Sequence, residues 1–233
     1  MPQQVVQIKH IGKVTFSKNR RSKNIKLSVK PDKSILVSYP FYVSKKEVLF
    51  FLTKNEAWIK QQQNRMGGQK TKISPETIIK SKIYNISFGL ANEHRVSKKG
   101  NELKIWVIDF ESDHTRNYIE HCLEEIYRFE AKNLLPKMLK ELAGQHGFSF
   151  NKVTIRNNRR NWGSCSSKNN ISLNLQMMKL PDHLIDYILL HELVHTQIKD
   201  HSPKFWQKLD EVCDNKAKFL AKEVRKYSTY TLP

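Results

Sequence analysis

The sequence contains few cysteines and no long apolar run. Its three cysteines, Cys122, Cys165 and Cys213, are an odd number without close pairing, which argues against a disulfide framework and favours a reducing compartment. Polar or charged residues interrupt every apolar stretch, so neither a signal peptide nor a membrane span is expected. These absences predict a cytoplasmic protein with no membrane association.

Acidic residues are also scarce. The chain has 22 Asp and Glu residues against 41 Lys and Arg residues, which gives a net charge of +19. A surface of this charge attracts polyanions, so nonspecific attraction to nucleic acid is expected. The sequence shows no internal repeat and no low-complexity linker.

The first 110 residues are strand-rich and are predicted to contain one helix. Residues 14–39 have the pattern of short strands in an antiparallel sheet. A capping box that begins at Ser44 opens a helix that is expected to reach Met66. Strand character then returns over residues 76–110.

Residues 111–233 are predicted to be mainly helical, with a hairpin between the helices. Helices are expected from Ser112 to Ala143, from Pro181 to Ile198, and from Ser202 toward the C-terminus, the first with a kink or break at Pro136. The order of elements predicts an α+β fold in which these two regions form one compact unit.

The segment HELVH places two histidines and a glutamate on one helix. His191 and His195 are four residues apart, so both imidazoles lie on the same helix face. Two such imidazoles bind zinc, and Glu192 between them is placed to act as general base on an activated water. The simpler interpretation is a core helix whose histidines only pack or hydrogen-bond, but its apolar flanks would make these groups costly to bury.

A catalytic zinc needs a third protein ligand and one open position. His201 is the best candidate, because the polar stretch between it and His195 can turn the chain back toward the helix. Glu211 or Glu223 is the alternative ligand, and Cys165 is a weaker one.

Four stretches near the C-terminus occur in an order and spacing that resembles the YgjP-like zinc metallopeptidase family. They are WGSCS, ISLN, IDYILLHELVH and HSPKFW. This family belongs to the zincin group, together with the SprT-like and Wss1-like proteases. The resemblance extends more loosely to the strands and the tryptophan-bearing helix of the N-terminal region.

The resemblance implies a zincin-like region with one Zn2+ ion held by His191, His195 and His201, and with Glu192 as base. It also implies a hairpin ahead of the HExxH helix, which matches Trp162 to Asn174. In zincins an exposed strand edge beside the metal pairs with an extended peptide, and the segment NISLNLQ is expected to supply it. Asn161 departs from the family pattern, which leads us to expect a basic residue or a threonine near this place.

Three functions remain open. The first is a zinc-dependent peptidase that acts on a peptide or protein substrate. The second is a metal-dependent nucleotide phosphohydrolase, in which Arg156, Arg159 and Arg160 form an anion-binding rim for a nucleoside triphosphate. The third is a nucleic-acid-binding module, which leaves the metal motif unexplained. The HExxH motif is mainly a peptidase signature, and no P-loop is visible, so the peptidase ranks first.

Overall fold

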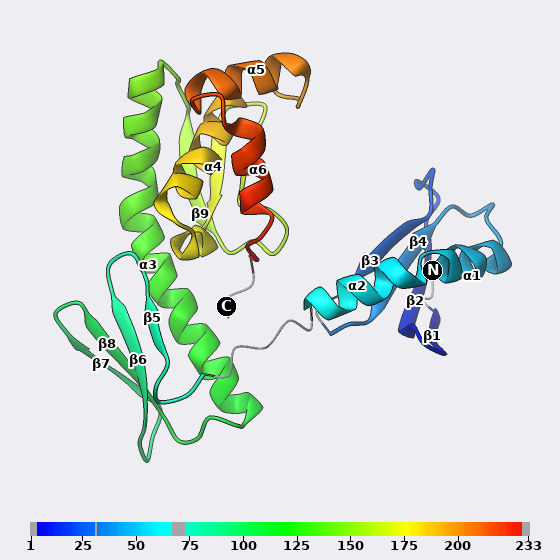
Figure 1. Ribbon diagram of the computed structural model, residues 1–233, viewed down its shortest axis with the longest axis horizontal. Coiled ribbons are helices and arrows are strands. Elements are labelled where there is room, and N and C mark those ends of the chain that lie inside the picture. Colours follow the sequence, from blue (N-terminus) through cyan, green and yellow to red (C-terminus); the bar gives the residue numbers. More distant parts are fainter. Residues whose placement is uncertain (1–3, 31, 67–72, 230–233) are drawn as a thin grey trace. The chain divides into compact units, whose positions relative to one another are not determined.

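The computed structural model describes residues 4–30, 32–66 and 73–229. The chain forms two compact units, residues 1–70 and 71–233, coloured blue to cyan and blue-green to red in Figure 1. The sequence places its boundary at residue 110. The observed division comes earlier because the second group of strands shares one hydrophobic core with the long helix that follows it.

The first unit is a four-stranded sheet with two helices. The strand order is β1-β2-β4-β3, in which the central pair β2 and β4 is parallel and both outer pairs are antiparallel. The sheet is therefore mixed, where the sequence predicts an antiparallel one, because β4 pairs with both β2 and β3. The elements are β1 (Gln4–Ile8), β2 (Gly12–Lys18), β3 (Lys26–Val29), β4 (Ile35–Tyr39), α1 (Lys45–Lys54) and α2 (Glu56–Met66).

The single helix predicted after Ser44 is two helices that meet at Asn55. Ser44 and Glu47 form the predicted capping box at the start of α1. At its end, the Asn55 side-chain amide donates a hydrogen bond to the carbonyl of Phe51 at 2.8 Å. Asn competes with the helical pattern through such local bonds, which the spacing of apolar residues did not reveal.

The second unit begins with a sheet of the same topology. Its strand order is β5-β6-β8-β7, again with a parallel central pair and antiparallel outer pairs. The chain thus builds one strand arrangement twice, although the sequence shows no repeat. The strands are β5 (Ile78–Lys80), β6 (Asn85–Leu90), β7 (Arg95–Lys99) and β8 (Glu102–Val107).

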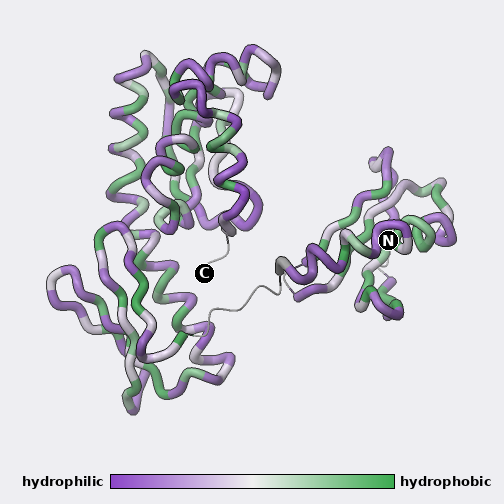
Figure 2. The backbone as a smooth tube through the Cα atoms, in the orientation of Figure 1, coloured by the Kyte–Doolittle hydropathy of each residue, from purple (hydrophilic) through white to green (hydrophobic). Residues whose placement is uncertain are grey.

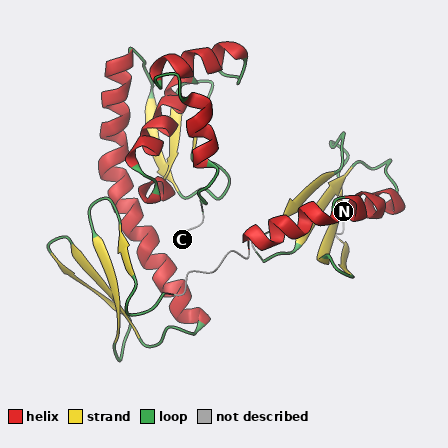
Figure 3. Ribbon diagram, in the orientation of Figure 1, coloured by secondary structure: helices red, strands yellow, loops and turns green. Residues whose placement is uncertain are grey.

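A long helix, α3 (Asp113–His146), runs along the second unit beside its sheets (Figure 3). Ser112 caps its first turn, and Gly147 ends it in the left-handed conformation with φ of 68°. Hydrophobic and hydrophilic residues alternate along α3 (Figure 2). The apolar side packs against the core that also holds the metal-motif helix.

The helix α3 continues through Pro136 and Gly144, where the sequence predicts a break and an end. Leu135, Leu139 and Ala143 are all buried, so the core holds the helix on both sides of the proline. This packing offsets the penalties of about 3 kcal/mol for proline and about 1 kcal/mol for glycine inside a helix.

A three-stranded sheet and further helices complete the second unit. β10 and β11 form the antiparallel hairpin predicted ahead of the motif helix, and β9 pairs parallel with β11. The elements are β9 (Lys152–Arg156), β10 (Gly163–Cys165), β11 (Asn170–Asn174), the 3-10 helix η1 (Leu175–Lys179), α4 (Asp182–Val194), α5 (Pro203–Val212) and α6 (Ala217–Val224). In the part of the chain that the structure describes, no helix is long and apolar enough to cross a membrane.

Two features of the predicted C-terminal helices differ in the structure. The motif helix ends at Val194, with His195 at its C-cap, instead of reaching Ile198. The last helix is interrupted between α5 and α6, where Asp214 and Asn215 have φ of 51° and 60°. Left-handed residues cannot continue a right-handed helix.

The buried residue Glu130 of α3 fixes the turn that leads into β6. Its carboxylate accepts hydrogen bonds from the Ser81 hydroxyl and from the backbone N–H groups of Lys82, Ile83 and Tyr84. One side chain therefore ties the β5–β6 hairpin to α3. Its loss would leave several donors without a partner in a region closed to water.

We expect Glu130→Ala to lower the free energy of unfolding by about 3 kcal/mol, because buried donors lose their acceptor. Chemical denaturation of the full chain measures this change. The control is Glu125→Ala on the same helix, where an exposed ion pair with Arg128 is lost and about 0.5 kcal/mol or less is expected. Equal effects of the two substitutions would contradict the structural role of Glu130.

Candidate active site

The three motif residues lie at the end of α4, inside the core of the second unit. Ile188, Leu189, Leu193 and Val194 are buried around them, so the helix is held on nearly all sides. The exposed fractions are 4% for Glu192 and 8% for His195. The three motif residues are thus held by a rigid, packed helix.

His201 reaches the motif from the loop that joins α4 to α5. Its Nε2 atom lies 3.2 Å from Nε2 of His191 and 3.3 Å from Nε2 of His195. Ligand atoms of all three histidines lie within 4.8 Å of one another. The structure therefore brings together the three histidines that the sequence proposed as ligands.

The protonation of these imidazoles favours a cation between them. The Nδ1–H of His195 donates to the carbonyl of Ile198 at 2.9 Å, which leaves its Nε2 as a free lone pair. Burial, followed by the charges of His195 and His201, lowers the pKa of His191 to about 3, so this ring is neutral. Both short contacts join ring nitrogens, and a single cation between the three rings would accept a lone pair from each of them.

Glu192 lies beside the three imidazoles with its carboxylate buried. Burial raises its pKa to about 8. Its Oε2 atom is buried and has no hydrogen-bond partner among the described residues. A buried polar atom without a partner is costly, and its place next to a proposed metal cluster indicates a functional group.

Gly163, the first residue of β10, gives Glu192 its space. A Cβ at this position would lie 2.6 Å from Oε1 and 2.7 Å from Cγ of Glu192. A glycine at this place in the sequence would ordinarily be interpreted as a turn position. The structure instead places it in a strand, where the missing side chain lets β10 approach the carboxylate closely.

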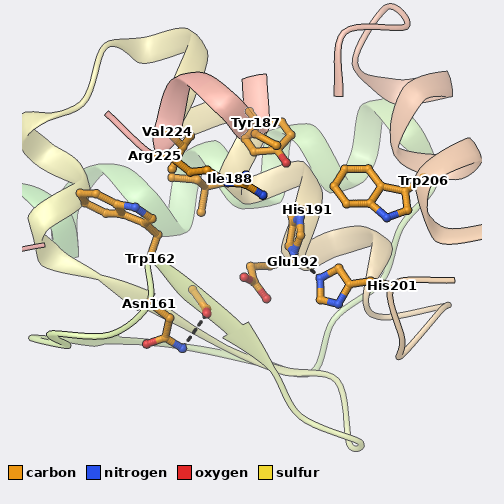
Figure 4. A pocket seen from close by; sticks show the side chains of 12 residues that line it. Asn161, Trp162, Tyr187, Ile188, His191, Glu192, His201, Trp206, Val224 and Arg225 are labelled. Carbon is orange, nitrogen blue, oxygen red and sulfur yellow. Dashed lines mark hydrogen bonds between the residues drawn. The ribbon is translucent and has the colours of Figure 1, made fainter. Parts of the chain in front are cut away.

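These groups line a cleft of about 370 Å³. Figure 4 shows Trp162, Tyr187 and Trp206 arranged around His191 and Glu192. Arg225 of the C-terminal segment also lines the cleft. The remaining lining residues are Asn161, Gly163, Ile188, His201, Ala221 and Val224. The cleft is thus largely apolar.

The free strand edge at this cleft belongs to β10. β10 pairs with β11 on one side, and β11 lies between β10 and β9. The segment NISLNLQ, which contains β11, is therefore not the open edge that the sequence predicts. Trp162 accepts a hydrogen bond from Asn174, and the alternation of an antiparallel ladder turns the backbone groups of Gly163 and Cys165 away from β11. The Gly163 carbonyl accepts only a side-chain bond in the described structure, from the Asn161 amide at 2.9 Å (Figure 4).

The other candidates from the sequence lie outside this cluster. Arg156, Arg159 and Arg160 are exposed, and none of them lines the cleft. Glu211 pairs with Lys208, and Glu223 pairs with Lys226. Among the described residues, the group that could hold a metal ion contains histidines alone.

Two cleft residues, Tyr187 and Arg225, are absent from the site predicted from the sequence. Tyr187 lies four residues before His191, so helical spacing could have placed it on the same face. Arg225 carries no comparable signal, because the break between α5 and α6 at Asp214 and Asn215 is what brings it to the cleft.

Comparison with known proteins identifies the family. The model of the YgjP-like metallopeptidase domain matches residues 23–225, which is most of the chain. The chain belongs to the YgjP-like metallopeptidase family. The match spans both compact units and includes every residue of the site described above. The resemblance inferred from the short motifs is thereby confirmed.

Two solved metallopeptidase zymogens resemble part of this YgjP-like metallopeptidase. Abylysin of Pyrococcus abyssi is 25% identical with a TM-score of 0.36, and jannalysin of Methanocaldococcus jannaschii is 23% identical with a TM-score of 0.35. Each comparison covers 40% of this chain and 94% of the zymogen. No curated protein matches the sequence.

Proposed function

We propose that this protein is a zinc-dependent peptidase in which His191, His195 and His201 hold the metal and Glu192 is the general base. The observation that carries the proposal is the convergence of three imidazole nitrogens beside a buried carboxylate without a partner. The site lies in a metallopeptidase domain, which supports hydrolysis of a peptide bond over other hydrolytic reactions.

The spacing of the nitrogens supports zinc. A tetrahedral ion with bonds of about 2.0–2.1 Å to nitrogen has ligand atoms about 3.3 Å apart. The two short separations, 3.2 Å and 3.3 Å, agree with this value. When bound, zinc supplies a water molecule of lowered pKa and polarises a carbonyl group.

Glu192 is suited to move a proton within the cleft. Its side chain is held by burial and by the close approach of Gly163. The charge of a bound zinc would lower its raised pKa, so that the carboxylate could accept a proton from the attacking water. The same carboxyl group can then donate that proton to the leaving amine. The hydrogen bond from Nδ1 of His195 to the backbone carbonyl of Ile198 keeps this ring in the tautomer whose Nε2 can bind the metal.

An extended peptide would bind along the free edge of β10. The Gly163 and Cys165 backbone groups can pair with the main chain of a substrate, which would place its scissile carbonyl beside Glu192. The apolar cleft lined by Trp162, Tyr187 and Trp206 would receive a substrate side chain. The phosphohydrolase alternative has less support, because Arg156, Arg159 and Arg160 lie outside this cleft.

The deciding experiment compares two substrates for zinc-loaded protein, an unfolded protein and a nucleoside triphosphate. We expect cleavage of the first alone. Hydrolysis of the triphosphate without proteolysis would replace the peptidase with the phosphohydrolase. A Glu192→Gln sample accounts for contaminating activity in both assays.

We expect the purified protein to hold about one zinc per chain, and His201→Ala to lose most of it, because two ligands bind far more weakly than three. Elemental analysis after dialysis measures the content. Glu211→Ala serves as the control, since Glu211 is exposed and pairs with Lys208. Full occupancy in His201→Ala would exclude this residue as the third ligand.

A further inference from the structure

The first unit carries most of the net positive charge of the chain. Residues 1–70 contain 15 Lys and Arg residues and 3 Asp and Glu residues, a net charge of +12 out of +19. The acidic residues have local roles: Asp32 and Glu47 accept hydrogen bonds from nearby serines, and Glu56 pairs with Lys60. They leave most of the basic charge without compensation.

The topology of this unit gathers basic and aromatic side chains at one end of its sheet. Strands β2 and β4 are parallel, so the segments that follow them leave the sheet at the same end (Figure 1). The loop after β2 carries Arg20, Arg21 and Lys23, and the segment after β4 carries Phe41 and Tyr42. The Tyr42 hydroxyl donates to the Lys23 carbonyl at 3.1 Å, which joins the two segments.

The basic loop has a defined conformation. The side-chain oxygen of Asn19 accepts a hydrogen bond from the Arg21 N–H at 2.9 Å, and its carbonyl accepts one from Ser22 at 3.2 Å. The resulting turn leaves both arginines and Lys23 exposed. In the part of the chain that the structure describes, none of these three cations forms a salt bridge with an acidic residue.

The aromatic pair is exposed beside this loop. Phe41 is 61% exposed and Tyr42 is 66% exposed. Their rings are 5.6 Å apart and nearly perpendicular. Apolar side chains of this size are usually buried, so two of them exposed next to three cations indicate a binding surface. The loop-end patch is defined as Arg20, Arg21, Lys23, Phe41 and Tyr42.

We propose that the loop-end patch binds single-stranded nucleic acid. Guanidinium and ammonium groups bind phosphates, and exposed aromatic rings stack on unpaired bases. A duplex conceals its base faces and offers the patch only phosphates. An anionic membrane would attract the same charges, but two rings bury too little apolar surface for stable anchoring. This binding site is separate from the proposed catalytic residues.

The test measures fluorescence anisotropy of a labelled 20-nucleotide single strand with the full-length protein at several salt concentrations. Arg20→Gln/Arg21→Gln/Lys23→Gln should weaken binding about tenfold or more and lower the salt slope by about 2, near 0.7 for each lost phosphate contact. Phe41→Ala/Tyr42→Ala should weaken binding about tenfold with little change in slope. Thermal melting verifies that each variant is folded.

The matched control removes the same charge elsewhere. Arg156→Gln/Arg159→Gln/Arg160→Gln also lowers the net charge by three, and its effect should be less than about threefold if the patch is a site. An equal loss in both triple variants would overturn the proposal, because net charge alone would then explain binding. Equal affinity for a duplex, or binding to phosphatidylserine vesicles without binding to the oligonucleotide, would overturn it as well.

Discussion

Replacing Glu192 with glutamine is expected to lower peptide hydrolysis at least about 100-fold, and up to about 10,000-fold. Glutamine keeps the size of the side chain but cannot accept a proton from the attacking water. The carboxylate is not among the proposed ligands, so the zinc content should stay unchanged. Steady-state kinetics on an unfolded protein, with elemental analysis of the same sample, measures both quantities.

A surface substitution provides the reference for this experiment. Glu211→Gln makes the same chemical change at an exposed ion pair, and its activity should stay close to that of the unmodified protein. Near-normal turnover in Glu192→Gln would mean that another group activates the water. Loss of zinc in the same variant would instead mean that Glu192 is a ligand.

The sequence could place His191 and His195 side by side because helical spacing is a local property. His191 and His195 are brought together by the helix itself, and the α+β fold class is confirmed. The resemblance to the family, carried by short motifs of the C-terminal half, was confirmed by a match over residues 23–225. The position of His201 depended on a turn, and it remained one choice among several until the structure was known.

Features that depend on tertiary contacts could not be predicted in the same way. The parallel pairing of β2 with β4 brings distant segments together, and the hydrophobic pattern is the same for either direction of pairing. For the same reason β11 could be mistaken for the open edge, although it is the central strand of its sheet. Pro136 and Gly144 remain helical because the surrounding core is buried, which local propensity does not include.

Gly163 is the clearest example, since its role is defined by one contact with Glu192. An alanine Cβ would lie 2.6 Å from Oε1 and 2.7 Å from Cγ, well inside normal contact distance. Glu192 is only 4% exposed, so its side chain has little room to move aside. We therefore expect Gly163→Ala to displace the carboxylate and lower kcat about 100-fold, the effect of misplacing a catalytic group by about 1 Å.

Zinc content and secondary structure should be retained in Gly163→Ala, because the added methyl group meets the base and not the histidines. Gly144→Ala is the matched control, since nothing lies within 4 Å of its added Cβ, and its activity should be normal. If Gly163 acts by positioning Glu192, adding Gly163→Ala to Glu192→Gln should cause little further loss, because the base is already absent. A further 100-fold loss in the double variant would show that Gly163 acts through substrate binding at the β10 edge instead.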